Sequence, residues 1–115
     1  MVEQQHYEIE ITHPARKRYR EEILNYLLDN FSFERALKIN DNITELVATL
    51  STIPERGTLE QQLENYHQKF RFILHKETRN LEIKIIYYVN QSIKKVYVTD
   101  FFPVLMYPEK LKRRN

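Results

Sequence analysis

Hydrophobic and polar residues follow three successive periodicities along this chain. Residues 6–12 alternate between apolar and polar, which predicts a strand with one buried face. Residues 14–31 and 33–53 place apolar positions three and four apart, which predicts two amphipathic helices. Three further segments alternate again: 67–75, 81–89 and 93–99. The order predicts an α+β fold with an N-terminal strand, a helical hairpin and then an antiparallel strand meander, the helices packed on one face of the sheet.

Helix-capping and turn residues set the expected ends of these elements. Ser32 is a good N-cap for the second helix, and Pro54 is expected to end that helix at the residue before it. Residues 54–65 read as a loop, with Gly57 as its flexible point. The run Phe101-Phe102-Pro103 is expected to end the last strand. Few loops are expected to be long, because this is the only glycine of the chain.

Length and charge describe a single domain over residues 1–115, with a basic tail at about 109–115. The chain has no cysteine, so disulfides, thiol catalysis and cysteine metal sites are excluded. No stretch approaches the roughly 20 apolar residues of a membrane span, and the N-terminus lacks the features of a secretory signal. We therefore expect a cytoplasmic protein with no membrane partner. The net charge of +2 is too small to indicate a polyanionic partner by itself.

The sheet face left free by the helices is expected to interleave cations with rings. Strand alternation places these residues there: His67, Lys69, Arg71, His75, Lys84, Tyr88, Lys95 and Tyr97. Cations neutralise phosphates and rings stack on bases, so a nucleic-acid interface is one interpretation. The other is an ordinary half-exposed sheet, whose wet face normally carries such side chains. The four histidines have no metal-ligand spacing, so no metal site and no cofactor are expected.

Several short motifs, taken in order, resemble a known family. They are Tyr7-x-Ile9-x-Ile11 leading to Pro14-Ala15, Ala36 within the second helix, Leu50-Ser51-Thr52-Ile53-Pro54 at its end, Lys69-Phe70-Arg71, Ile83-Lys84-Ile85-Ile86-Tyr87-Tyr88-Val89 and Tyr107-Pro108-Glu109-Lys110-Leu111. This ordered set is similar to that of the ParE and RelE toxins of bacterial type II toxin–antitoxin systems. The likeness runs from about Tyr7 to Leu111.

The resemblance implies a small toxin of plasmid-stabilisation systems that causes growth arrest and is held inactive by a cognate antitoxin, a small acidic protein. ParE-like members act on DNA gyrase, whereas RelE-like members cut mRNA on the ribosome without a metal. If the chain is such an endoribonuclease, the candidate catalytic residues are Lys69, Arg71, Lys84, Tyr88 and Tyr107.

Two departures favour the ParE-like branch and a non-enzymatic action. Lys84 stands where an arginine is common in the family, and lysine cannot form the same planar fork with phosphate. Residues 101–106 carry no charged group where the nucleases usually offer an arginine or histidine. A RelE-like nuclease and a degenerate, non-toxic binding member remain the alternatives.

The apolar run 101–107 has two interpretations. It either completes the core or receives the antitoxin or target, because so many apolar side chains are rarely left in water. The candidate contact residues for a partner protein are Phe101, Phe102, Leu105, Met106, Lys95 and Tyr97.

Overall fold

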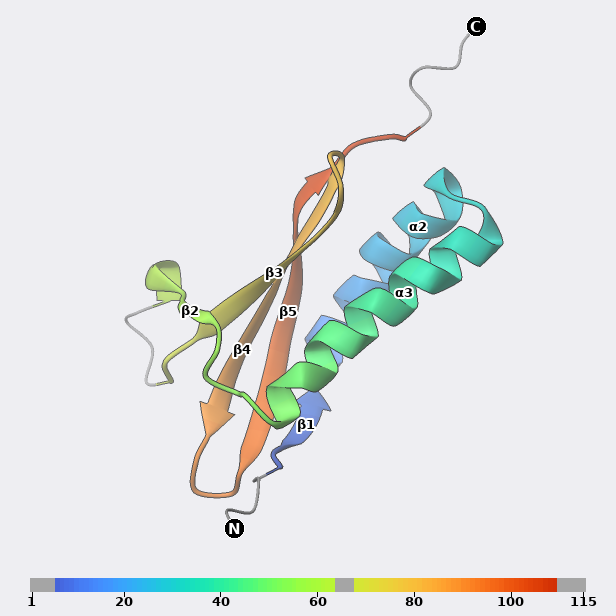
Figure 1. Ribbon diagram of the computed structural model, residues 1–115. Coiled ribbons are helices and arrows are strands. Elements are labelled where there is room, and N and C mark those ends of the chain that lie inside the picture. The colour runs from blue at the N-terminus through green and yellow to red at the C-terminus, as the bar shows by residue number, and fades with distance from the viewer. Residues whose placement is uncertain (1–5, 64–67, 110–115) are drawn as a thin grey trace, which may run out of the picture.

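A five-stranded mixed sheet carries a helical hairpin on one face (Figure 1). The computed structural model describes residues 6–63 and 68–109. Its strands are β1 Glu8–Ile11, β2 Thr58–Leu59, β3 Arg71–Thr78, β4 Leu81–Asn90 and β5 Lys95–Met106. Their order is β1-β5-β4-β3-β2, with β1 parallel to β5 and the other neighbours antiparallel. The predicted fold class is confirmed, although the short strand β2 was not expected.

The helical hairpin has two arms joined near Phe31. The first arm is α1 His13–Arg18, a π-helical stretch η1 Tyr19–Leu24, and α2 Asn25–Asn30. The second is α3 Phe33–Ala48, followed by a 3-10 turn, η2 Thr49–Ser51. Ser32 caps α3 as predicted, because its Oγ accepts a hydrogen bond from the backbone N–H of Arg35 at 3.1 Å. Among the described residues, no helix is long and apolar enough to cross a membrane.

The core lies between the hairpin and the sheet. Ile39, Ile43 and Leu50 are fully or almost fully buried, which confirms the stripe predicted for the second helix. Leu46 packs at the margin of this cluster and is only partly buried. The alternation predicted for β4 is also confirmed, since every second residue from Leu81 to Tyr87 is inaccessible to solvent.

The faces of β3 are the reverse of the prediction. Ile73 is buried and pairs with Ile85. Arg71 and His75 lie two residues to either side of Ile73, so they share its face, which is the helix side of the sheet. Leu74 lies on the other face and is 49% exposed. The more apolar set of residues does not face the core here, because β3 lies near the sheet edge, where polar side chains find partners on the helices and the preceding loop.

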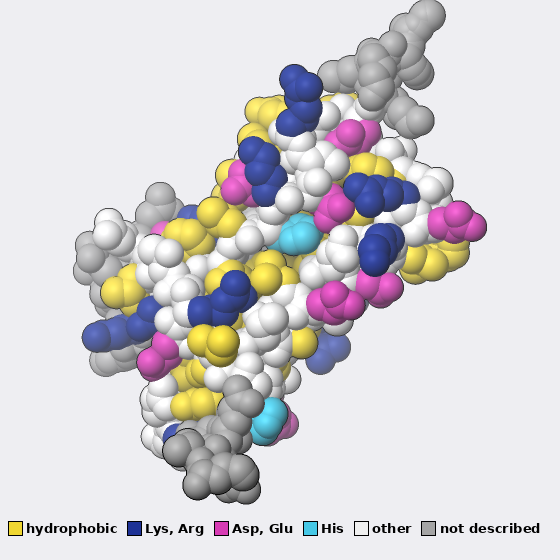
Figure 2. Space-filling view, viewed as in Figure 1, with side chains coloured by type: hydrophobic (Ala, Val, Ile, Leu, Met, Phe, Trp, Pro, Cys, Tyr) yellow, Lys and Arg dark blue, Asp and Glu magenta, His cyan; other side chains and the backbone are white. Residues whose placement is uncertain are grey.

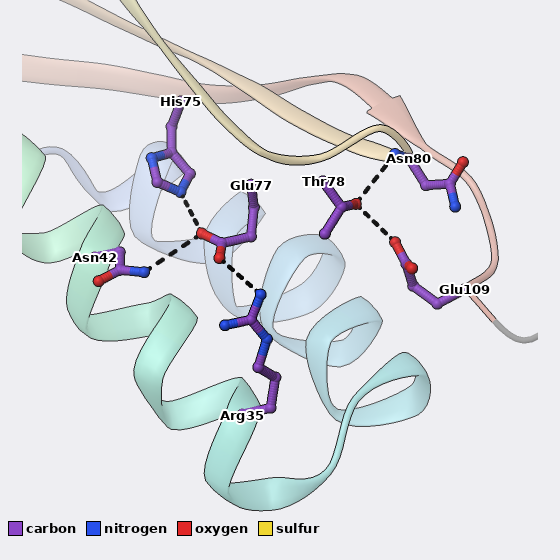
Figure 3. A network of polar contacts seen from close by, with 7 residues as sticks. All are labelled: Arg35, Asn42, His75, Glu77, Thr78, Asn80 and Glu109. Carbon is purple, nitrogen blue, oxygen red and sulfur yellow. Dashed lines mark hydrogen bonds and ion pairs between the residues drawn. The ribbon is translucent and has the colours of Figure 1, made fainter.

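His75 shows how the polar face of β3 is satisfied. Its Nε2 lies 2.8 Å from Glu77 Oε1, and Arg35 of α3 donates to the other oxygen of that carboxylate at 3.1 Å (Figure 3). Asn42, also on α3, approaches the same carboxylate at 3.5 Å. Glu77 is 9% exposed at its side chain. The network therefore joins α3 to β3 through polar contacts, beside the apolar core.

The last strand does not end at Phe101-Phe102-Pro103, so that prediction is wrong. β5 continues to Met106, with two register shifts against β4. Pro103 is tolerated because β1 pairs with β5 only as far as Val98, which makes the rest of β5 an edge strand. The extension brings Phe101 into the core, where it is 3% exposed.

Gly57 is a point of close approach between the loop, β3 and β4. Its backbone N–H donates to the hydroxyl of Tyr87 at 2.9 Å, and the chain has no glycine with positive φ. A Cβ at this position would lie 2.5 Å from the Tyr87 hydroxyl and 2.6 Å from the carbonyl oxygen of Phe72. The described part of the predicted loop also contains β2 and a 3-10 turn, η3 Gln61–Leu63.

Candidate functional site

The sheet face opposite the helices, which we call the outer face, carries a row of aromatic rings. Tyr88 of β4 stacks on Tyr97 of β5 with ring centroids 5.1 Å apart. Phe70 meets the other side of Tyr88 edge-on at 5.4 Å. Tyr88, Tyr97 and Lys95 thus lie where strand alternation predicted. Such a row could stack flat ligands, but its rings already contact one another.

Lys95 reaches this row from the start of β5. Its ammonium lies 5.3 Å from the ring centroid of Tyr97 and 2.8 Å from the carboxylate of Glu10 on β1. The hydrogen bond to Glu10 raises the pKa of Lys95 and keeps it protonated. The charge is therefore already paired.

Lys84, one of the five candidate residues for a nuclease, is paired inside the protein. Its Nζ lies 2.8 Å from Glu60 Oε1 and 4.4 Å from the ring centroid of Phe72. The Glu60 side chain is 6% exposed, because the segment after β2 turns onto the outer face. A lysine neutralised by a buried carboxylate attracts phosphate weakly.

Three of the five nuclease candidates meet at one end of the sheet. Lys69, Arg71 and Tyr88 line a shallow hollow of about 420 Å³. Arg71 donates to the carbonyl oxygen of Gly57 at 2.9 Å, so it also braces the loop before β2. Glu55 lines the same hollow and accepts a hydrogen bond from Gln91 at 2.6 Å. Two cations and a carboxylate share this end of the molecule.

Tyr107 and Lys84 do not join that group. The backbone N–H of Tyr107 bonds to the carbonyl oxygen of Asn80 at 2.9 Å, next to the turn that begins β4. Tyr88 lies seven residues beyond Leu81, the first residue of β4, which corresponds to about 23 Å at 3.3 Å per residue. No phenol from Tyr107 can therefore act on a phosphate held at Lys69. His67 falls outside the described residues.

The contact candidates of β5 separate into core and surface. Phe101 packs against the ring of Tyr19 at 5.0 Å and belongs to the core. Phe102 is 43% exposed on the outer face, under the guanidinium of Arg18 at 5.6 Å. Leu105 is half-buried, and Met106 packs against the core cluster. Phe102 and Leu105 are thus the apolar candidates that a partner could reach.

The visible face of the molecule in Figure 2 carries charges of both signs. On the face seen in Figure 2, Lys and Arg side chains are interspersed with Asp and Glu and with apolar surface. Asp100 illustrates this on β5, since its carboxylate lies 3.2 Å from Arg18. The surface shown has no continuous basic field of the kind that polyanions require.

Sequence reasoning missed the acidic partners of the candidate cations. Glu60, the partner of Lys84, and Glu55, beside Lys69 and Arg71, come from the segment between α3 and β3, where alternation gives no guide. Glu10, the partner of Lys95, lies on β1. For Glu60 a general rule gave some guidance, because a charged residue that becomes buried needs a counter-ion. Across residues 6–63 and 68–109, no group of three or more His, Asp or Glu side chains could hold a metal ion.

Two tyrosines, Tyr19 and Tyr26, are expected to ionise at an unusually high pH. Burial raises the pKa of Tyr19 from its usual 10.0 to about 12, and burial together with Glu109 does the same for Tyr26. Because the folded state holds these protons more tightly, this contribution to stability is complete below pH 10 and is lost as the pH rises towards 12. Absorbance at 295 nm should show late ionisation that disappears in Tyr19→Phe and Tyr26→Phe. An unchanged titration in both variants would contradict the burial of these hydroxyls.

Comparison of the chain with protein-family models, with characterised proteins and with solved structures finds no match. Any functional proposal must therefore be drawn from the motifs and geometry of the chain itself.

Proposed function

We propose that this chain is the toxin component of a bacterial type II toxin–antitoxin system and that it arrests growth by binding a protein, DNA gyrase being the target that the ParE-like resemblance implies. The order of elements that accompanies the family motifs supports the proposal. The strand, helical hairpin and antiparallel meander occur in the structure in that order. A small acidic antitoxin is the partner that such a system requires.

The proposal that the toxin acts without catalysis rests on one observation: the lysine and arginine side chains of the sheet are paired within the protein. Lys84 is paired with Glu60, Lys95 with Glu10, and Arg71 donates to backbone carbonyls. An RNA-cleaving site needs positively charged groups that are directed at a phosphate and a positioned acid or base. Lys84, Lys95 and Arg71 direct their charges at carboxylates or carbonyl oxygens of the chain itself instead.

The apolar surface of β5 is the region we assign to protein contact. Phe102 is 43% exposed and Val104 is 42% exposed, next to the half-buried Leu105. These side chains lie on the part of β5 that pairs with β4 on one side and, beyond Val98, has no strand among the described residues on the side of β1. A protein partner would bury them, whereas an RNA backbone would gain little from them.

A RelE-like, ribosome-dependent endoribonuclease is the second candidate. The hollow at Lys69, Arg71 and Tyr88 favours it, because an exposed lysine, an arginine and a phenol converge there. Its weakness is the carboxylate of Glu55 in the same hollow, which lowers the affinity for phosphate. A degenerate, non-toxic binding member is the third candidate.

Controlled expression separates a toxin from a degenerate member. Induced alone in a bacterial host, the chain is expected to arrest growth, and co-expression of a small acidic protein encoded beside it should restore growth. Normal growth at high levels of folded protein would leave only the degenerate member. Filamentation and induction of the DNA-damage response are the expected phenotype of blocked gyrase.

A pair of variants separates the two toxin mechanisms. If the chain is a nuclease, Lys69→Gln should lower codon-linked mRNA cleavage by about 10²–10⁴-fold in primer extension. If it is ParE-like, no such cuts occur in the wild type, and Lys69→Gln arrests growth as the wild type does. The matched control is Lys38→Gln, an exposed lysine on α3 in the other layer of the fold.

A further inference from the structure

An apolar hollow lies between the two arms of the helical hairpin. It has a volume of about 200 Å³ and opens between α1–η1 and α3. Its lining residues are Ile11, Arg16, Tyr19, Ile43, Thr44, Val47 and Phe101. The hollow lies on the helix side of the sheet, away from the aromatic row of the outer face, and Ile11 is the residue that it shares with the family motifs.

The walls of the hollow are fixed before any ligand arrives. The Tyr19 ring packs on Phe101 at 5.0 Å, and its hydroxyl donates to Asn40 Oδ1 on α3. Ile43 and Val47 are almost fully buried from α3. With the one phenol already satisfied, these side chains offer hydrocarbon and ring surface. Protein interiors are close-packed, and an apolar cavity of about 150 Å³ is enough to bind benzene.

A single cation stands at the hollow. Arg16 is exposed, and its Nε donates to the carbonyl oxygen of Ile11 at 2.9 Å, which holds the start of the guanidinium against the wall. No ion pair or hydrogen bond of Nη1 or Nη2 of Arg16 occurs among the described residues. The guanidinium therefore keeps donors for one anionic group. A carboxylate matches their fork geometry.

We infer that this hollow, with its apolar walls and Arg16 at its edge, binds a small amphiphilic acid that has one ring or a short branched chain and one carboxylate. The apolar body fills the space over Phe101 and Val47, and the carboxylate lies on Arg16. The volume limits the body to about one ring. The inference stands apart from the toxin proposal, because it uses none of the outer-face residues.

Binding should stabilise the fold as well as fill the hollow. The lining comes from β1, α1, η1, α3 and β5, so a ligand bridges both arms of the hairpin and the sheet. A ligand that binds only the folded state raises the free energy of unfolding with its concentration. The melting temperature should therefore rise with the concentration of the acid.

The test uses 3-phenylpropionate as the acid and 3-phenylpropanol as its uncharged counterpart, with the full chain. Titration followed by ¹H–¹⁵N chemical shifts should move the amides of Ile11, Tyr19, Ile43 and Phe101 at low millimolar acid. Arg16→Gln should weaken the acid about tenfold and leave the alcohol unchanged. Lys17→Gln, the matched control, removes an exposed charge from the same turn without touching the lining and should leave both affinities unchanged.

Three results would overturn the inference. One is the absence of localised shifts at millimolar acid in protein shown to be folded by its amide spectrum. Another is an equal loss of acid affinity in Arg16→Gln and Lys17→Gln, which would reveal a general charge effect. The last is a peptide ending in Phe that binds here more than tenfold tighter than the free acid, which would assign the hollow to a chain end of a partner protein.

Discussion

Replacing Ile39 with alanine is expected to lower the free energy of unfolding by about 2–5 kcal/mol. Ile39 is completely buried on the face of α3 that covers the sheet. Its side chain lies in the single cluster that joins the helical hairpin to β4 and β5. Urea denaturation followed by circular dichroism measures the change.

The neighbouring Leu37 supplies the matched control. It lies on the same helix but is 49% exposed, so Leu37→Ala should change stability by no more than about 0.5 kcal/mol. Equal effects of the two substitutions would contradict the orientation of α3. That result would require the hairpin to present a different face to the sheet.

Replacing Gly57 with alanine is expected to destabilise the fold by about 1–3 kcal/mol, since an added methyl group would overlap two atoms. A Cβ there would lie 2.5 Å from the Tyr87 hydroxyl and 2.6 Å from the backbone oxygen of Phe72. Neither atom can move freely, because Tyr87 is buried and Phe72 lies in β3. Thermal denaturation followed by circular dichroism measures the effect.

The sign of this change separates two interpretations of Gly57. If the glycine served only as a flexible point, alanine would raise the free energy of unfolding by about 0.4–1 kcal/mol, because it lowers the conformational entropy of the unfolded chain. A more stable Gly57→Ala variant would thus contradict the close approach. In the Tyr87→Phe background the cost of Gly57→Ala should shrink without vanishing, because the contact with the Phe72 carbonyl remains.

The layered fold could be predicted where side chains follow a strict period. In β4 the alternation from Leu81 to Val89 has one apolar face over its whole length, and α3 has a continuous stripe. In β3 both faces contain apolar residues, so alternation alone predicts the wrong face for Arg71 and His75. Only tertiary partners, Arg35 and Asn42 on α3, explain why the polar set faces inward.

The end of β5 escaped prediction for a different reason. A proline normally argues against strand continuation, because it cannot donate to a ladder hydrogen bond. On an edge strand that donor is not needed, and edge position depends on β1 pairing with only the first part of β5. Pairing between segments that are more than 80 residues apart is not visible in local sequence pattern.

The sequence predicts several of the residues that lie on the outer face, but it does not predict the carboxylates that pair with the lysines there. Tyr88, Tyr97 and Lys95 share the outer face as alternation indicated, yet the carboxylates that neutralise the lysines were not anticipated. Glu60 comes from a segment that alternation treats as loop. These carboxylates pair Lys84 and Lys95 internally, which argues against the nucleic-acid interpretation of this face and is in line with the proposed protein target.

Supercoiling by purified DNA gyrase in the presence of the purified chain tests the central claim most directly. The proposal predicts that the chain inhibits supercoiling as its concentration approaches that of gyrase, and that the cognate antitoxin reverses the inhibition. Full supercoiling in a molar excess of folded chain, together with codon-linked cuts in a translated message, would contradict it and assign the chain to the nucleases.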